Sequence, residues 1–327
     1  NTTLAVTISE AVFNTNGGSG NLQASDFVFT ISGGSATLGS ATPTSIEANG
    51  NIYTLGINIS DVSNGLDTLF VNPLDDSIYD LVGNKADSLQ NNNSVLLNDI
   101  TAPSVISVSS STVDGLYKIS DEIAIEVTFS ESVVVNSALF QGDGTGRPIL
   151  TLETGSSDKV INYISGSGGA VLTWNYTVES GNTSSDLDYK STTALVLNSG
   201  TIKDATGNAA TLALPALGAS GSLSANKALV IDGIPPLIAS SSLASDNSYV
   251  DLTISEAVYN TINGSGDLEA SDFTLTFAQN SGNATGASIA SMSALSGSET
   301  ILRISLNITG TPSGVETIAI TPVNASS

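Results

Sequence analysis

The chain has 327 residues, of which 31 are acidic and 8 basic, so its net charge at pH 7 is −23. This charge disfavours nucleic acids and anionic membrane surfaces as partners and favours cations. Cysteine and histidine are both absent, which excludes disulfides, thiolate metal sites and the commonest general base of enzymes. No run of about 18 apolar residues is present to span a bilayer. We therefore expect no nucleic-acid partner, no direct membrane insertion and no enzyme activity.

Segments in which apolar and polar residues alternate recur along the chain, as they do in half-buried β-strands. In chain order they include Leu4 to Ile8, Phe27 to Ile31, Ile123 to Phe129, Leu172 to Val178 and Val250 to Ile254. Turns rich in Gly, Asn and Ser separate these segments, and no segment keeps a helical period of about 3.6 residues. The sequence predicts an all-β protein of sandwich type, with Trp174 in a core rather than stacked on a sugar.

One nine-residue segment occurs twice. It begins at Thr7 and reappears at Thr253, 246 positions later, with a single exchange of Phe13 for Tyr259. The likeness continues through an Ala-Ser-Asp-Phe tetrapeptide that begins at Ala24 and again at Ala270. A chain that copies a module in this way is typical of repeat arrays, which provide reach or multivalency rather than one reaction centre.

Two proline-containing linkers, residues 98–103 and 231–236, divide the chain into domains 1–99, 100–232 and 233–327. We call these module 1, module 2 and module 3. Modules 1 and 3 are of one type (A), and module 2 is of a second type (B). Aligned on the repeated segment, module 1 lacks its first strand and module 3 lacks its last strands. Three explanations stay open: a piece of a longer array, trimmed ends, or strands donated between subunits of a fibre.

Carboxylates recur at corresponding places in the modules. A Ser-Glu pair closes the second strand at Glu10, Glu131 and Glu256, and an Asp-x-x-Gly-Asn pattern begins at Asp80 and Asp204. Asp99 and Asp232 lie on the linkers, and Asp272 is a further candidate beside the second linker. In a seven-stranded sandwich these places meet at the end where the chain enters the domain.

We therefore predict two metal sites at the junctions. The first combines Asp99, Glu131 and Asp204, and the second combines Asp232 and Glu256, with Asp272 as a possible third ligand. Crowded carboxylates repel one another, and calcium, which binds about 6 to 8 oxygen ligands, relieves that repulsion. An alternative stays open in which these acids are solvated and the Asp-x-x-Gly-Asn residues only shape a hairpin turn.

Module 2 resembles the immunoglobulin-like repeats of large bacterial surface proteins and adhesins. The resemblance is carried in order by Asp114 to Lys118, Val127 to Glu131, Leu150 to Gly155, Asp186 to Tyr189, Gly200 to Asp204 and Leu223 to Ala228. The outer modules look like a sister type. The resemblance implies tandem immunoglobulin-like β-sandwich domains in an extended array, a location outside the cell or on the bacterial cell surface, and in some cases calcium at the linkers.

The sequence therefore predicts a stalk or fibre segment of an exported bacterial surface protein. Its expected partners are neighbouring repeats or identical subunits, and a cell-surface or polysaccharide ligand stays open. Two alternatives also stay open: a subunit of a self-assembling extracellular filament with strand exchange, and non-catalytic modules of a secreted polysaccharide-degrading enzyme.

Overall fold

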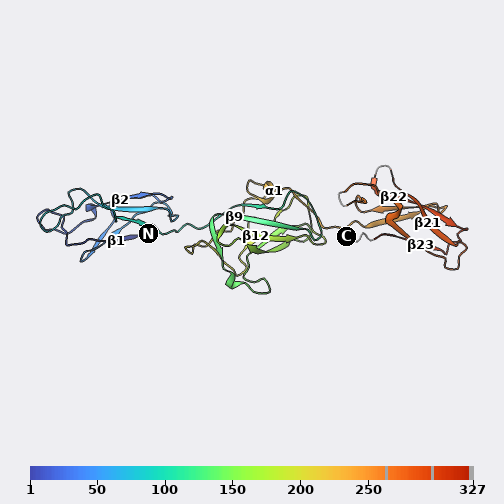
Figure 1. Cartoon of the computed structure of the whole chain (residues 1–327), viewed down its shortest axis with the longest axis horizontal. Helices are drawn as coiled ribbons and strands as arrows, with labels where there is room; N and C mark the ends of the chain where they lie inside the picture. Colours follow the sequence, from blue (N-terminus) through green and yellow to red (C-terminus); the bar gives the residue numbers. More distant parts are fainter. Residues whose placement is uncertain (262–263, 296–297, 324–327) are drawn as a thin grey trace. The chain divides into compact units, whose positions relative to one another are not determined.

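The computed structural model describes residues 1–261, 264–295 and 298–323 (Figure 1). Their backbone is almost entirely strands and connecting turns, with one four-residue α-helix, α1 (Leu223–Asn226). The prediction of an all-β protein is thus confirmed. The chain divides into two units, Asn1–Asp232 and Gly233–Ser327. The first unit contains two hydrophobic cores and the second contains one.

Module 1 is built from two three-stranded sheets. One sheet has the order β1-β4-β3 and the other β2-β5-β6, both antiparallel. The strands are β1 (Thr3–Thr7), β2 (Phe27–Ser32), β3 (Ile46–Asn49), β4 (Ile52–Gly56), β5 (Thr68–Pro73) and β6 (Ser94–Leu96), and the 3-10 turn η1 (Ala24–Asp26) precedes β2. Alternate residues of β2 and β5 face the core, where Phe29 and Leu69 are fully buried.

Module 2 centres on one long strand, β9 (Glu122–Val135), which pairs with three neighbours. Its sheet has the order β14-β10-β11-β12-β9-β16, with β15 also on β10 and β7 also on β9. The other strands of this sheet are β7 (Val105–Ser110), β10 (Ile149–Glu153), β11 (Lys159–Ser165), β12 (Gly169–Thr177), β14 (Asp188–Tyr189), β15 (Leu195–Val196) and β16 (Ile202–Lys203). The 3-10 turn η2 (Ser137–Leu139) follows β9.

A second, smaller sheet completes module 2. It has the order β13-β17-β8 and consists of β13 (Thr183–Ser184), β17 (Leu229–Asp232) and β8 (Gly115–Lys118). Strands β17 and β8 pair in parallel. Parallel strands need a long connection, and these two satisfy that need because they lie at opposite ends of the module's sequence. Strands β7 and β8, which follow one another where the chain enters the module, therefore belong to different sheets: β7 to the large sheet and β8 to the small one.

Module 3 repeats the plan of module 1 in the strands that both contain. Its sheets are β18-β19-β22-β21 and β20-β23. The elements are β18 (Ile238–Leu243), β19 (Tyr249–Ile254), η3 (Ala270–Asp272), β20 (Phe273–Ala278), β21 (Gly286–Leu295), β22 (Ser298–Thr309) and β23 (Thr317–Pro322). Phe27 pairs with Pro73 in module 1, and Phe273 pairs with Pro322 in module 3, so the duplicated sequence folds in the same register.

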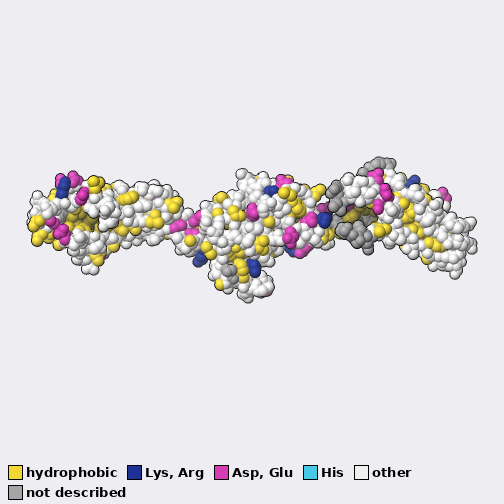
Figure 2. Space-filling view, viewed as in Figure 1, with side chains coloured by type: hydrophobic (Ala, Val, Ile, Leu, Met, Phe, Trp, Pro, Cys, Tyr) yellow, Lys and Arg dark blue, Asp and Glu magenta, His cyan; other side chains and the backbone are white. Residues whose placement is uncertain are grey.

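Charged side chains are few, and most of them are acidic, with 31 acidic and 8 basic residues in the chain. In the face drawn in Figure 2, most of the surface is neither apolar nor charged, and basic side chains are sparse. Uncharged polar side chains and backbone atoms therefore make up most of the face that Figure 2 draws. Among the residues that the structure describes, no helix has the length and apolar character needed to cross a membrane.

Trp174 is a core residue, as predicted. Its side chain is fully buried, its Nε1 donates to the carbonyl of Pro148 at 3.1 Å, and its ring meets Tyr163 edge-on at 5.7 Å. Because an aromatic side chain of this size leaves a large cavity when it is truncated, Trp174→Ala should lower the free energy of unfolding by about 3–5 kcal/mol.

Denaturant unfolding followed by circular dichroism measures this change. The matched control is Val171→Ala on the same strand, where the side chain is 40% exposed and the expected change is within about 0.5 kcal/mol. Equal effects of the two substitutions would contradict the placement of Trp174 in the core.

Candidate metal centre

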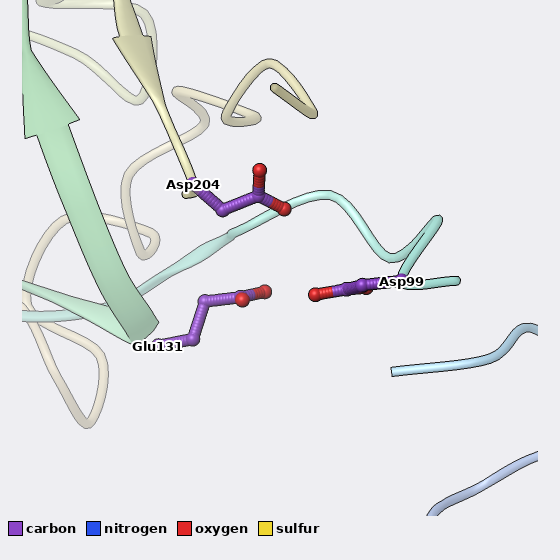
Figure 3. Close-up of side chains that lie close together, drawn as sticks. All are labelled: Asp99, Glu131 and Asp204. Carbon is purple, nitrogen blue, oxygen red and sulfur yellow. The ribbon is translucent and has the colours of Figure 1, made fainter. Parts of the chain in front are cut away.

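Three carboxylates from distant parts of the first unit come together. Asp99 lies in the segment after β6, Glu131 lies within β9, and Asp204 follows β16. One carboxylate oxygen from each lies within 4.8 Å of the other two. Figure 3 shows the side chains of Glu131 and Asp99 pointing toward one another, with Asp204 beside them. The structure thus brings together the three residues predicted for the first junction.

Asp204 is held by the turn that it begins. Its Oδ1 accepts hydrogen bonds from the backbone N–H groups of Thr206, Gly207 and Asn208 at 2.9, 2.6 and 2.8 Å. Gly207 has a φ of +101°, which a residue with a side chain rarely adopts. The Asp-x-x-Gly-Asn sequence is therefore needed for the turn itself, because the aspartate caps the N–H groups and the glycine allows the reversal.

The second oxygen of Asp204 is less committed. Oδ2 accepts one hydrogen bond, from Nδ2 of Asn208 at 2.7 Å. Burial acts to raise the pKa of Asp204, but the hydrogen bonds from Asn208, Thr206 and Gly207 outweigh it and lower that pKa below its ordinary value. Asp204 therefore stays ionised although it is only 6% exposed, and its Oδ2 retains capacity for another partner.

Asp99 is fixed by contacts on both sides of the linker. Its Oδ1 accepts from the N–H of Thr101 at 2.9 Å, and its carbonyl oxygen accepts from Nδ2 of Asn208 at 3.3 Å. The next residues bond to the module 1 loop, where the carbonyl of Ser63 accepts from the N–H of Ile100 and the hydroxyl of Thr101. Asn208 thus contacts both Asp99 and Asp204. Hydrogen bonds to Ser63 and Asn208 hold the beginning of the linker, residues 99–101, in place.

Glu131 lies where β9 departs from regular pairing. The register of β9 against β12 shifts between Val171, opposite Thr128, and Gly169, opposite Val133. Such an irregularity re-aims side chains locally. Burial, together with the charges of Asp99 and Asp204, raises the pKa of Glu131 above its ordinary value.

No basic side chain offsets this charge. Within the described part of the chain, the ion pairs of Lys and Arg involve other acids, and none reaches Asp99, Glu131 or Asp204. Three carboxylates in this arrangement offer hard oxygen donors of the type that Ca²⁺ binds. The geometry can therefore accept a cation, whereas it offers no nucleophile and base in contact for covalent chemistry.

The remaining predicted ligands do not form such a group in the part that the structure describes. Asp80 caps its own turn, where Oδ1 accepts from the N–H groups of Val82 and Asn84 at 2.9 and 2.8 Å. Glu10 is exposed and lines the same groove of module 1 as Asp80. These two acids alone do not assemble a site, because no third carboxylate joins them.

The second predicted junction is distributed over the two units. Asp232 ends β17 in the first unit, and Glu256 follows β19 in the second, so their combination stays a prediction. Asp272 has a structural role of its own: its Oδ2 accepts from the N–H of Glu269 at 2.7 Å and caps η3. In module 1 the Oδ2 of Asp26 accepts from the N–H of Gln23 at 2.7 Å and caps η1 in the same way. This bond is therefore part of the fold that modules 1 and 3 share.

The sequence reasoning missed the role of the serine in the Ser-Glu pair. In module 2 the N–H of Ser130 donates to the carbonyl of Ser104 at 2.8 Å, and its hydroxyl accepts from the N–H of Ser104 at 3.0 Å. In module 3 Ser255 makes the same two bonds with Leu237, at 2.8 and 2.9 Å. We call this pair of bonds the serine clamp. The repetition of serine before each glutamate was the signal that could have found it.

Comparisons with known proteins do not identify a family for this chain. No protein-family model matches the chain, and no curated protein matches it. A solved structure, that of surface layer protein SbsC, domains 1–6, aligns with 94% of this chain at 11% identity and a TM-score of 0.20. The alignment covers 34% of that chain, so this protein spans about a third of its length. A TM-score this low carries no argument about the fold or function of this chain.

The two Asp-x-x-Gly-Asn turns provide a matched pair for testing the capping role. Asp204→Ala leaves three backbone N–H groups without the acceptor that a carboxylate only 6% exposed provides, so it should lower the free energy of unfolding by about 1–3 kcal/mol. Asp80→Ala removes the corresponding cap where the aspartate is only partly buried, so water can replace the carboxylate more readily and the effect should be smaller.

Chemical denaturation of both variants, in chelator, measures the difference. An Asp80→Ala effect equal to or larger than that of Asp204→Ala would show that burial does not govern the contribution of these caps.

Proposed function

We propose that this chain is a structural repeat segment of an exported bacterial surface protein, in which tandem immunoglobulin-like modules form a stalk or fibre. The observation that carries the proposal is the reuse of local structure: modules 1 and 3 share the strand register and the capped 3-10 turn, and modules 2 and 3 share the serine clamp. Copies built to one plan serve length and repetition, which are structural tasks.

We propose no catalytic role for these residues. The acidic group at Asp99, Glu131 and Asp204 is tied to a linker and to a turn cap, and neither His nor Cys is present in the chain. Neighbouring repeats or identical subunits are the proposed partners, and the bacterial cell surface is the proposed location.

We further propose that Ca²⁺ binds the three carboxylates and stiffens the linker. Asp99 would contribute the ligand from the linker itself, while Glu131 and Asp204 would contribute ligands from β9 and the turn after β16. A cation bound to all three would fix Asp99 relative to module 2 and offset the charges of Asp99 and Asp204, which together with burial, the larger cause, raise the pKa of Glu131. Calcium sites of extracellular modules typically have Kd values of about 10⁻⁴–10⁻³ M, matched to calcium outside cells.

Glu131→Gln tests this proposal because the sign of its effect should depend on calcium. In chelator the substitution removes one of three crowded negative charges, so the melting temperature should stay equal or rise. With calcium at about ten times its Kd, the wild-type chain gains about 1.4 kcal/mol through ligand binding, and the variant, which has lost a charged ligand, should gain less.

The matched control is Glu10→Gln, since Glu10 is the counterpart of Glu131 in module 1 and has no described acidic trio around it. Its response to calcium should equal that of the wild type. A wild-type melting temperature that calcium does not change, together with no calcium binding by isothermal titration calorimetry, would refute the calcium proposal while leaving the structural role intact.

A further inference from the structure

One acid of module 1, outside the three carboxylates of the candidate metal centre, is completely buried. Asp67 lies directly before β5 and is 0% exposed. Its Oδ1 accepts a hydrogen bond from the N–H of Ala36 at 2.8 Å, and its Oδ2 accepts from the N–H of Asn64 at 3.2 Å. Burying a carboxylate costs free energy unless hydrogen bonds compensate for the lost water. These two bonds therefore stabilise the acid where water does not reach it.

The two bonds tie together two loops of module 1. Ala36 belongs to the segment after β2, and Asn64 belongs to the segment between β4 and β5. The carboxylate packs against the backbone of Gly34, where a Cβ would lie only 2.1 Å from Oδ1 of Asp67. Gly34 also has a φ of +37°, so the position requires glycine. We call the pair of bonds from Asp67 the carboxylate latch.

Module 3 contains the same latch with a different acid. Glu316 stands directly before β23, as Asp67 stands before β5. Its Oε1 accepts from the N–H of Ala284 at 2.8 Å, and its Oε2 accepts from the N–H of Ser313 at 2.9 Å. A Cβ at Gly282 would lie 2.2 Å from Oε1. Backbone hydrogen bonds, that from Ala284 foremost, hold the pKa of Glu316 at about 2. The latch is thus part of the type A fold.

In the first unit the latched turn, residues 63–67, also holds the linker. The carbonyl of Ser63 accepts from the N–H of Ile100 at 3.0 Å and from the hydroxyl of Thr101 at 2.8 Å. The carbonyl of the latch aspartate itself accepts from the N–H of Leu97 at 2.8 Å. The turn therefore holds the chain on both sides of the aspartate that the linker contributes to the metal centre.

That aspartate, Asp99, also lies against the turn. A Cβ at Gly65 would lie 3.1 Å from the Cβ of Asp99, so the two backbones approach closely there. From this position the carboxylate of Asp99 points toward Glu131, with Asp204 beside them (Figure 3). Glu131 and Asp204 are held by elements of module 2. Asp99 is therefore the member of the trio whose position depends on module 1.

We propose that Asp67 is a positioning residue of the metal centre. This inference rests on the calcium role proposed above. With the latch closed, the turn 63–67 keeps Asp99 beside Glu131 and Asp204 before a cation arrives, so binding does not have to order the linker. Ordering a ligand in advance lowers the entropic cost of binding. The affinity for calcium is then set in part by a buried side chain of the preceding module.

Asp67→Asn opens this latch with little change of shape. Asp67 uses both of its oxygens, one for each N–H group, whereas an amide has a single acceptor oxygen. In module 2 a neutral residue serves at the corresponding turn because one oxygen is enough there. The Oδ1 of Asn182 accepts from the N–H of Glu179 at 2.9 Å and from the hydroxyl of Tyr176 at 3.0 Å. Asparagine at position 67 can keep only one of the two bonds.

The test uses the full 327-residue chain and calcium chloride in isothermal titration calorimetry, together with amide hydrogen exchange of Ile100 in chelator. We expect Asp67→Asn to raise the Kd for calcium about three- to tenfold and to speed exchange of the Ile100 N–H, whose acceptor lies in the turn. A role of Asp67 in local stability alone would lower the melting temperature and leave the Kd unchanged.

Glu316→Gln is the matched control, because it opens the same latch in the second unit. We expect it to lower the melting temperature of that unit and to leave both the Kd for calcium and the exchange of Ile100 at their wild-type values. A loss of calcium affinity equal to that of Asp67→Asn would overturn the proposal, since the effect would then not depend on the linker.

A second pair of variants acts on the linker without touching the latch. Thr101→Val removes the hydroxyl that donates to Ser63 and should raise the Kd about two- to fivefold, whereas Thr101→Ser keeps that hydroxyl and should recover the wild-type Kd. If circular dichroism shows that Asp67→Asn has unfolded module 1, this pair decides. Wild-type Kd values for both Thr101→Val and a folded Asp67→Asn would overturn the proposal.

The exchange measurement separates this inference from the calcium proposal. A wild-type chain that binds no calcium would refute the calcium proposal, and the exchange of Ile100 would then decide whether Asp67 positions the linker. Faster exchange in Asp67→Asn than in the wild type would uphold the positioning role. Equal exchange in the two chains would overturn it.

Discussion

The pairing of an entering strand with the strand that carries the Ser-Glu pair is the interaction on which the module plan depends. A strand edge presents unpaired N–H and C=O groups, and these groups must find partners if the sheet is to exclude water from its core. In modules 2 and 3 the serine fixes the entering chain with two hydrogen bonds, and the strand then continues along the edge. The linker before that strand is therefore part of the module's closure.

This constraint also explains why acids gather at the start of module 2. The glutamate adjacent to the clamp serine is held where the chain enters, the linker supplies Asp99 there, and the turn after β16 supplies Asp204. Each acid occupies its place for a local reason, and their sum is a concentration of negative charge without a basic partner among the described residues. A divalent cation is the simplest way to balance such a group. Closure and the proposed cation site are thus consequences of one geometry.

Much of this could be predicted from the sequence, because the signals were local or repeated. Strand alternation predicted the all-β fold and the burial of Trp174, and matching positions in different modules predicted that Asp99, Glu131 and Asp204 would meet. The role of Asp272 could not be separated from metal binding, since an acid that caps a 3-10 turn and an acid that binds a metal look alike in a single sequence. The clamp also escaped prediction, because serine is abundant in the chain and its partner is a backbone group, which carries no sequence signal.

Amide hydrogen exchange at the two clamp serines tests the central claim most directly, because it reads the same N–H group in two copies of one motif. The account predicts slow exchange for Ser130 and Ser255, whose N–H groups donate to the entering strand. Exchange at both serines as fast as that of the exposed residues in the turns would contradict the claim that strand entry at this serine closes the modules.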